Sequence, residues 1–182
     1  PLIFTNNDSG YETAIEFKKN GVDPIILDTR KDPKSEIIDE AKKLDIQIKF
    51  SYVVVAAKGY KKVKSAEVAK ISDDKNELGT LETINCDCIC VSGFWTPTIH
   101  LASQSGNKTT FNKDIDAFVP GLSKQNETTL GAANGTFTLE ETLKNSFDSG
   151  YELSKKITNN DNKTSLPIVM EKKSTTHDKF WC

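Results

Sequence analysis

The sequence has little net charge and no long apolar run, and both absences exclude classes of function. Its 24 lysine and arginine residues nearly balance 26 aspartate and glutamate residues, which leaves a net charge of -2. Proteins that bind nucleic acid or an anionic membrane carry a basic excess, so neither kind of partner is indicated. No apolar stretch approaches the roughly 20 residues needed to cross a bilayer. Because no signal-peptide pattern opens the chain, the expected location is the cytoplasm.

The four cysteines lack the spacing of common metal or disulfide sites. Three of them form Cys86-x-Cys88-x-Cys90, and no C-x-x-C pair is present. On a regular strand this period of two places all three thiols on one face, so they do not converge on a single ion. We therefore expect buried structural thiols and no metal site, with a metal or redox role as the alternative.

Two glycines of a phosphate-binding turn are also missing. Thr5-Asn-Asn-Asp-Ser-Gly10 lies where a dinucleotide-binding fold carries G-x-G-x-x-G between a strand and a helix. Thr5 and Asn7 replace the first two glycines, and only Gly10, which lets helix and strand pack closely, is kept. Asp28 lies about where a ribose-binding carboxylate is found, roughly twenty residues past the turn. We interpret Asn7, Gly10 and Asp28 as a vestigial nucleotide site.

Strands and helices alternate in the first part of the chain. Apolar runs predict strands at 2–4, 24–28 and 46–49, separated by two amphipathic helices. Ser9 with Glu12 forms a capping box for the first helix, and Asp32 with Pro33 is expected to start the second. This order predicts a right-handed parallel unit.

Residues 51–84 have an antiparallel pattern instead. The β-rich segments 51–57, 62–71 and 78–84 are parted by polar turns and predict a meander. Residues 86–93 then form an apolar strand that ends on a glycine and can rejoin the parallel sheet. The expected fold class is α/β, a three-layer Rossmann-like dinucleotide-binding fold with an antiparallel β meander.

The most specific motifs follow that strand. They are Val91-Ser-Gly-Phe-Trp-Thr-Pro-Thr-Ile-His-Leu-Ala-Ser-Gln104, Ala117-Phe-Val-Pro120 and Gly131-Ala-Ala-Asn-Gly-Thr-Phe137. In this order they resemble motifs of the alpha subunit of heterotetrameric sarcosine oxidase and of related amine- and opine-oxidising complexes. The turn at Thr5-Asn-Asn-Asp8 is also similar to the family's first turn, so the resemblance covers residues 4 to about 147.

The resemblance implies a flavoprotein fold with two dinucleotide domains and a division of the chain into three parts. Residues 1–91 would form a second nucleotide-binding-like domain, and residues 92–157 the C-terminal part of the first, FAD/NAD-like domain. Residues 158–182 would be a polar linker and the start of a next segment. Because the chain opens without methionine and inside a predicted strand, we expect it to be a fragment of a longer polypeptide.

The resemblance also implies NAD as the ligand of this subunit, with the redox flavins in or against a partner. The implied contact residues lie at two turns and are Ser92, Gly93, Phe94, Gly131, Ala132, Ala133, Gly135 and Thr136. Small residues let a backbone approach a ligand, and Thr138 with Glu141 would cap a helix whose free amides favour a phosphate. Tight packing between strand and helix is the alternative explanation of these small residues. Asn134 departs from the class, which places an aspartate for the flavin there.

Three side chains near the first of these turns have alternative roles. Phe94 and Trp95 have the rings to stack on a nucleotide base, or they pack at a domain junction. His100 lies near Ser103 and Ser105, but no G-x-S-x-G elbow or matched acid accompanies it. We therefore expect a structural, hydrogen-bonding role for His100.

By the same resemblance, the complex oxidises sarcosine with oxygen to glycine and hydrogen peroxide and passes the one-carbon unit to tetrahydrofolate. It would contain FAD and FMN, and its other subunits, including a flavin-bearing one, would be the partners of this chain. No residue here is assigned to amine oxidation, so the fragment alone is not expected to be catalytic. Three alternatives stay open: an autonomous NAD(P)H-dependent flavoprotein reductase, an opine or proline dehydrogenase subunit, and a non-binding assembly scaffold.

Overall fold

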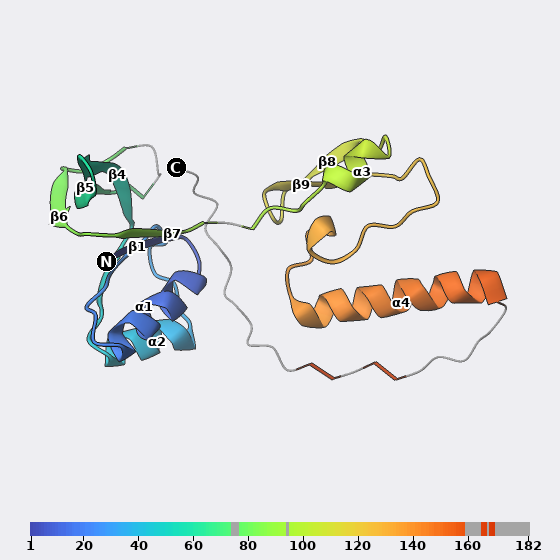
Figure 1. Cartoon of the computed structure of the whole chain (residues 1–182), viewed down its shortest axis with the longest axis horizontal. Helices are drawn as coiled ribbons and strands as arrows, with labels where there is room; N and C mark the ends of the chain where they lie inside the picture. Colours follow the sequence, from blue (N-terminus) through green and yellow to red (C-terminus); the bar gives the residue numbers. More distant parts are fainter. Residues whose placement is uncertain (74–76, 94, 159–164, 167, 170–182) are drawn as a thin grey trace. The chain divides into compact units, whose positions relative to one another are not determined.

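The computed structural model describes residues 1–73, 77–93, 95–158, 165, 166, 168 and 169 (Figure 1). The chain divides into two compact units, the first containing residues 1–94 and the second residues 95–173. We describe each unit by itself. The assignment of residues 1–91 and 92–157 to two nucleotide domains, with a linker from residue 158, stays a prediction.

A four-stranded parallel sheet forms the centre of the first unit. Its strands are β1 (Leu2–Thr5), β2 (Ile25–Asp28), β3 (Gln47–Phe50) and β7 (Ile89–Ser92). They lie in the order β3-β2-β1-β7, and each neighbouring pair is parallel. The predicted return of the chain to the parallel sheet after the meander is confirmed.

Helices α1 (Ser9–Lys19) and α2 (Glu36–Lys43) cover one face of this sheet (Figure 1). Alternate residues of the strands face alternate layers, as the two-residue period of a strand requires. Thus Ile3 and Ile26 join the buried cluster on the helix side, whereas Leu2 and Leu27 join the cluster on the other side.

The meander forms the third layer. Its strands β4 (Tyr52–Gly59), β5 (Val63–Lys70) and β6 (Glu82–Asn85) pair antiparallel in the order β4-β5-β6. Ala66 and Val68 of β5 are fully buried and belong to the cluster that contains Leu2 and Leu27. The predicted three-layer Rossmann-like fold is therefore confirmed.

Both predicted helix starts are wrong in detail. Asp8 is the N-cap of α1, and Ser9 lies in the first turn with no capping box. Ser35, not Asp32, is the N-cap of α2, and its backbone is extended with φ -156° and ψ 158°. The loop between β2 and α2 contains Arg30, which is 7% exposed.

The cysteines do not share one buried face, which corrects the expectation from their spacing. A bend at Asp87 separates β6 from β7, so the regular alternation of a strand is broken between Cys86 and Cys90. Cys86 packs against the meander-side cluster and Cys90 against the helix-side cluster, while Cys88 is exposed. Burial raises the pKa of the Cys86 and Cys90 thiols.

The second unit contains short elements and one long helix. They are α3 (His100–Gln104), the antiparallel pair β8 (Thr109–Asn112) and β9 (Ala117–Pro120), the 3-10 helix η1 (Gly131–Asn134) and α4 (Leu139–Thr158). No described residue of α4 is buried. The predicted cap is confirmed, since the Thr138 hydroxyl donates to Glu141 at 2.8 Å and accepts the Glu141 amide at 3.3 Å.

Candidate functional site

The carboxyl edge between β1 and β7 is where a parallel α/β sheet of this kind binds a nucleotide. The chain leaves β1 toward β2 on one side and returns to β7 on the other, so this edge is a topological switch point. The turn after β1 carries Asn7, and β7 ends at Ser92 and Gly93. The structure thus brings three of the predicted site residues together.

Asn7 closes this edge with its own side chain. Its Nδ2 donates to the Gly93 carbonyl at 2.6 Å, and the Ser92 carbonyl lies 3.4 Å away. Its Oδ1 accepts from the amide and hydroxyl of Ser9 at 2.9 and 2.7 Å, and the hydroxyls of Ser9 and Ser92 are hydrogen bonded to each other. A glycine would leave this space to a pyrophosphate, whereas Asn7 is 8% exposed and fills it.

Gly10 has the packing role expected of the third glycine. A Cβ atom at Gly10 would lie 2.7 Å from the Cβ of Thr5, which is closer than real atoms approach. The Thr5 hydroxyl is occupied locally, since it donates to the Asn7 carbonyl at 2.8 Å and accepts the Asn7 amide at 3.2 Å. The helix and strand therefore pack as in a nucleotide-binding turn, while the polar groups of the turn bond to one another.

Asp28 is fully buried, and its carboxylate is held by protein donors. Arg30 donates from Nε to Oδ1 at 3.0 Å and from Nη2 to Oδ2 at 2.8 Å, and its backbone amide donates to Oδ1 at 2.9 Å. The Tyr11 hydroxyl donates to Oδ2 at 2.6 Å. Arg30 also reaches Asp8 through Nη1 at 2.8 Å. With both oxygens engaged, Asp28 has little capacity left for a ribose hydroxyl.

The electrostatics of this cluster favour the closed arrangement. Burial, followed by the negative charge of Asp28, raises the pKa of Tyr11 well above its usual value, so the hydroxyl stays a donor. Burial disfavours the Arg30 cation, but its hydrogen bonds to Asp28 and Asp8 outweigh burial and raise its pKa. The sequence interpretation of Asp28 missed Arg30, because an opposite charge two positions later does not by itself identify a partner.

The second set of predicted residues lies around η1. Gly131 and Gly135 adopt positive φ values of 65° and 83°, which other residues rarely do. A Cβ at Gly131 would lie 2.9 Å from Cγ2 of Thr142, and one at Gly135 would lie 2.6 Å from Cδ1 of Ile115. Backbone conformation and packing thus account for both glycines. The exposed residue of this set is Ala132.

The N-terminus of α4 is poorly suited to a phosphate, contrary to the sequence expectation. Glu140 and Glu141 lie in its first turn, where their carboxylates already interact favourably with the positive end of the helix dipole. Thr138 also occupies the amide of Glu141.

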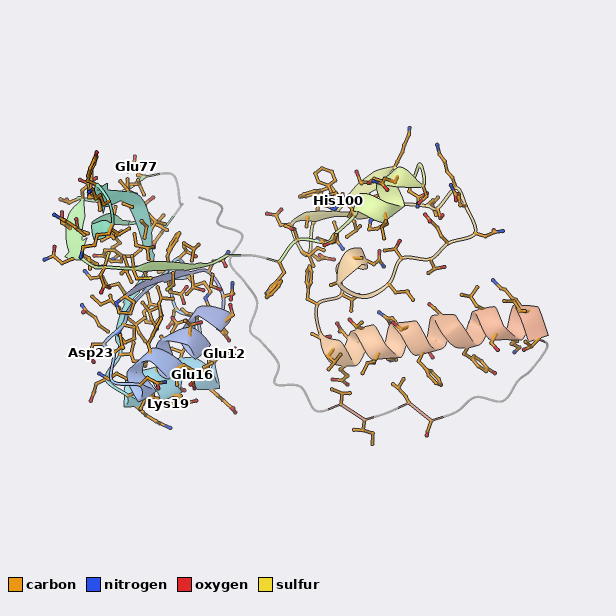
Figure 2. The ribbon with its side chains drawn as sticks, in the orientation of Figure 1. Glu12, Glu16, Lys19, Asp23, Glu77 and His100 are labelled. Atoms are coloured by element: carbon orange, nitrogen blue, oxygen red, sulfur yellow. The ribbon has the colours of Figure 1, made fainter. Side chains whose placement is uncertain are left out.

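The remaining predicted residues are dispersed. Thr136 donates its amide to the Gly131 carbonyl at 3.1 Å, and Ala133 is half-buried. Phe94 lies outside the described residues. His100 is exposed at the start of α3 (Figure 2), and the structural, hydrogen-bonding role expected for it stays a prediction.

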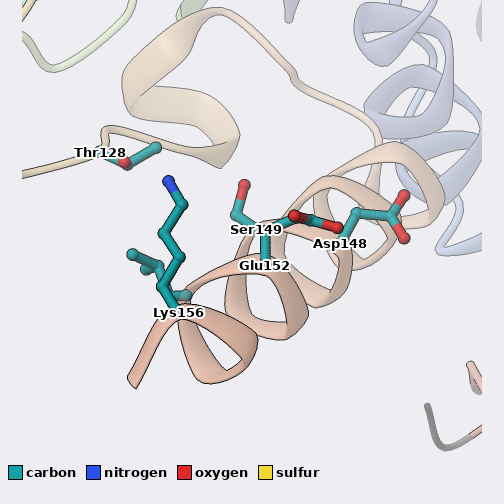
Figure 3. Close-up of a pocket in the computed structure, with 6 residues that line it drawn as sticks. Thr128, Asp148, Ser149, Glu152 and Lys156 are labelled. Carbon is teal, nitrogen blue, oxygen red and sulfur yellow. The ribbon is translucent and has the colours of Figure 1, made fainter. Parts of the chain in front are cut away.

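One shallow hollow lies along α4 (Figure 3). It has a volume of about 270 Å³ and is lined by Thr128, Asp148, Ser149, Glu152, Leu153 and Lys156. Pockets for small molecules hold roughly 300–1,000 Å³ and are mostly apolar. Because this hollow is smaller, and no predicted contact residue lines it, we assign it no ligand.

Within the part of the chain that the structure describes, no helix combines the length and the apolar character of a membrane span.

Solved structures share the fold of this chain. The structure is similar to thioredoxin reductase from Lactococcus lactis, with a TM-score of 0.57, 16% identity and coverage of 75% of this chain and 45% of that one. It is also similar to the bacillithiol disulfide reductase of Staphylococcus aureus, with a TM-score of 0.53, 17% identity and coverage of 75% and 46%. The chain therefore has the Rossmann-like fold of FAD/NAD(P)-binding reductases.

The matches to sequence relatives are more specific than the matches to solved structures. The chain is 35% identical over 138 residues to sarcosine oxidase subunit alpha of Rhizobium meliloti (strain 1021), a match that covers 75% of this chain and 13% of that protein. It is 28% identical over 144 residues to the subunit of the same name in Corynebacterium sp. (strain P-1), which covers 78% and 15%. No protein-family model matches the sequence. The resemblance to part of a sarcosine oxidase alpha subunit is confirmed. The match spans 13% of the length of the first of these relatives.

Proposed function

We propose that this chain is part of the alpha subunit of a sarcosine oxidase-like oxidoreductase complex and contributes to its dinucleotide-binding region. The observation that carries the proposal is the 35% identity over 138 residues to a sarcosine oxidase alpha subunit. The Rossmann-like three-layer fold of the first unit agrees with it, since that fold is a common frame for nucleotide binding.

In this proposal the first unit is a scaffold. The closure of the β1–β7 edge by Asn7 supports this role, because a pyrophosphate needs the space that the Asn7 side chain fills. The pairing of Asp28 with Arg30 supports it as well, because a ribose-binding carboxylate must have free acceptor capacity. Asn7, Gly10 and Asp28 then keep the geometry of a nucleotide site without its ligand.

NAD is the proposed ligand of the second unit. Of the residues Gly131, Ala132, Ala133, Gly135 and Thr136, the exposed Ala132 is the one available for contact, since the glycines face packing partners. Ser92 and Gly93 belong to the first unit, so the contacts predicted for them and for Phe94 are not part of this proposal. NAD here would be a bound dinucleotide, and FAD, FMN and tetrahydrofolate would bind other parts of the complex.

The proposed reaction of the complex is the oxidation of sarcosine by oxygen to glycine and hydrogen peroxide, with the one-carbon unit passed to tetrahydrofolate. Other subunits, including one that carries a flavin, are the proposed partners, and the cytoplasm is the proposed location. We assign this chain no residue of the amine oxidation step.

A second candidate is an assembly scaffold with no nucleotide affinity. The positions of Gly131 and Gly135 favour it, because contacts with Thr142 and Ile115 explain both glycines without a ligand. In that case the complex would assemble equally well with and without NAD.

The activity is tested by reconstituting the full alpha subunit that contains this chain with its flavin-bearing partners. Hydrogen peroxide production is measured with sarcosine, with proline and with an opine as substrates. We expect turnover of sarcosine. Turnover of proline or the opine alone would assign the complex to a different amine oxidoreductase, and NADH oxidation by the chain alone with added flavin would indicate an autonomous reductase.

A further inference from the structure

We propose that Cys88 and Cys90 form a reversible disulfide, which makes the start of β7 a site of thiol oxidation. The two Sγ atoms lie 3.7 Å apart, and Cys88 is exposed. The pair is independent of the nucleotide sites, and nothing in the function proposed above uses it.

Formation of the bond requires only a short movement of the two sulfur atoms. A disulfide has an S–S distance of about 2.0 Å, so the sulfur atoms need to approach by less than 2 Å from 3.7 Å. Cys88 precedes β7, and its carbonyl accepts the Leu2 amide of β1 at 2.9 Å. β7 lies at the edge of the described sheet, so one strand, β1, constrains the backbone of this segment.

The two thiols have different environments, which suits them to different steps. The exposed Cys88 is open to a dissolved oxidant, whereas Cys90 packs against the helix-side cluster. Burial, followed by its contact with Cys88, raises the pKa of Cys90. Since the thiolate is the attacking species, Cys88 is the thiol that reacts first and Cys90 the one that resolves it.

A hydroperoxide supplies the oxidising equivalents. The Cys88 thiolate attacks one peroxide oxygen, the O–O bond breaks, and a sulfenic acid forms while water leaves. The Cys90 sulfur then attacks the sulfenic sulfur, an S–S bond forms, and the sulfenic oxygen leaves as a second water. Two thiols lose two electrons and two protons, and hydrogen peroxide becomes two waters. The reaction proposed for the complex would produce hydrogen peroxide locally, but the thiol chemistry does not depend on that source.

This disulfide would be labile. It closes a ring with one intervening residue, so it removes little chain entropy from the unfolded state and adds little stability. Such short rings also strain the preferred disulfide geometry, and strained or exposed disulfides are the easily reduced ones. A reversible site is therefore expected at this position.

Cys86 provides a matched control within the same segment. It packs on the opposite side of the sheet, against the cluster that contains Ala66 and Val68. It is two residues from Cys88, as Cys90 is, so sequence spacing alone would pair either one with Cys88. The geometry selects Cys90.

The test treats the full chain, carrying Cys182→Ser, with hydrogen peroxide and maps its disulfides by mass spectrometry without reduction. We expect a Cys88–Cys90 linkage in this parent and in its Cys86→Ser variant, and complete loss of the linkage in Cys88→Ser and Cys90→Ser. Dithiothreitol should restore both thiols, and dimedone should label Cys88 in Cys90→Ser.

A linkage that contains Cys86, disulfides between chains alone, or sulfinic acid at Cys88 without any linkage would overturn the proposal. The parent alone decides the matter if a serine variant does not fold, since its linkage is identified directly from the peptide map.

Discussion

Arg30 is the residue on which the first unit's polar core depends. It is 7% exposed and lies between the buried Asp28 and the nearly buried Asp8, with ion-pair distances of 2.8 Å to each. Removing one partner from a buried ion pair leaves an uncompensated charge, which costs far more than the pair itself contributes. The same residue donates to both carboxylate oxygens of Asp28, which are the atoms that a ribose hydroxyl would need.

Arg30→Met should therefore lower the free energy of unfolding by about 3–5 kcal/mol. Lys31→Met is the matched control, because the Lys31–Asp73 pair is exposed, at 72% and 78% for the two side chains, and should contribute less than about 1 kcal/mol. Urea denaturation followed by circular dichroism measures both. Equal losses in the two variants would contradict the buried network.

Comparison of wild type with Tyr11→Phe should show how the contribution of the Tyr11 hydroxyl to the free energy of unfolding depends on pH. The hydrogen bond to the Asp28 carboxylate is 2.6 Å long, and loss of such a bond to a charged group costs about 1.5–3 kcal/mol. Because the folded pKa of Tyr11 is raised above the unfolded value of about 10, this contribution is fully present below pH 10. It should be lost progressively as the pH rises further.

The measurement is the difference in unfolding free energy between wild type and Tyr11→Phe from neutral pH to pH 11. We expect it to shrink above pH 10. Tyr60→Phe is the control, because the Tyr60 side chain is 94% exposed and removal of its hydroxyl should change the unfolding free energy little. A difference for Tyr11→Phe that stays constant above pH 10 would rule out the raised pKa.

At the scale of elements, α1 lies against β1 at a distance set by Gly10. A methyl group there meets Thr5 at 2.7 Å, and overpacking of this kind costs about 1–3 kcal/mol. Gly10→Ala should therefore destabilise the chain. Gly150→Ala is the control, because a Cβ there meets nothing within 4 Å, and replacing glycine by alanine inside a helix adds about 1 kcal/mol. Thermal denaturation should give opposite signs for the two variants, and equal signs would contradict the close packing of α1 on β1.

Local capping, not burial, should hold the start of α4. None of its described residues is buried, so little tertiary packing supports it. Thr138→Ala removes the hydroxyl that accepts the Glu141 amide and should cost about 1 kcal/mol, with a loss of helical circular dichroism. Thr138→Ser keeps the hydroxyl and should behave like wild type. Unchanged helicity in the alanine variant would show that the cap is unimportant.

Apolar periodicity was sufficient to predict the strands and helices of the first unit and the meander, because each has a strand or helix period. The predicted starts of α1 and α2 were wrong because they depend on side chains whose partners are distant in sequence or turned inward, whereas the cap of α4 is local and was predicted correctly. Asn7, for example, binds both Ser9 and the Gly93 carbonyl 86 positions away. The prediction that the cysteines share one face was wrong because a bend at Asp87 interrupts the alternation of side chains along the strand.

For the whole molecule, the sequence relatives and the Rossmann-like fold agree with each other. The position of a ligand, however, depends on individual side chains that neither comparison describes. The absence of two glycines at Thr5 and Asn7 predicts a vestigial nucleotide site, and the hydrogen bonds of the Asn7 side chain support that prediction. The partner of Asp28 could not be inferred from the pattern alone, because an arginine two residues later points as readily to solvent or to a phosphate. We therefore propose that the second unit, and not the turn after β1, contributes the NAD contacts.

Calorimetric titration of NAD into the full alpha subunit tests this central claim most directly, with Ala132→Glu as the test variant. A carboxylate at Ala132 would repel a pyrophosphate and should weaken binding about tenfold or more, which corresponds to about 1.4 kcal/mol. Leu122→Glu adds the same charge in the same unit at a residue that is 95% exposed and outside the contact set, and it should bind NAD as wild type does. Affinity lost in Ala132→Glu alone would support NAD binding by the second unit. Equal affinity in all three proteins, or no NAD binding by the wild type, would contradict it.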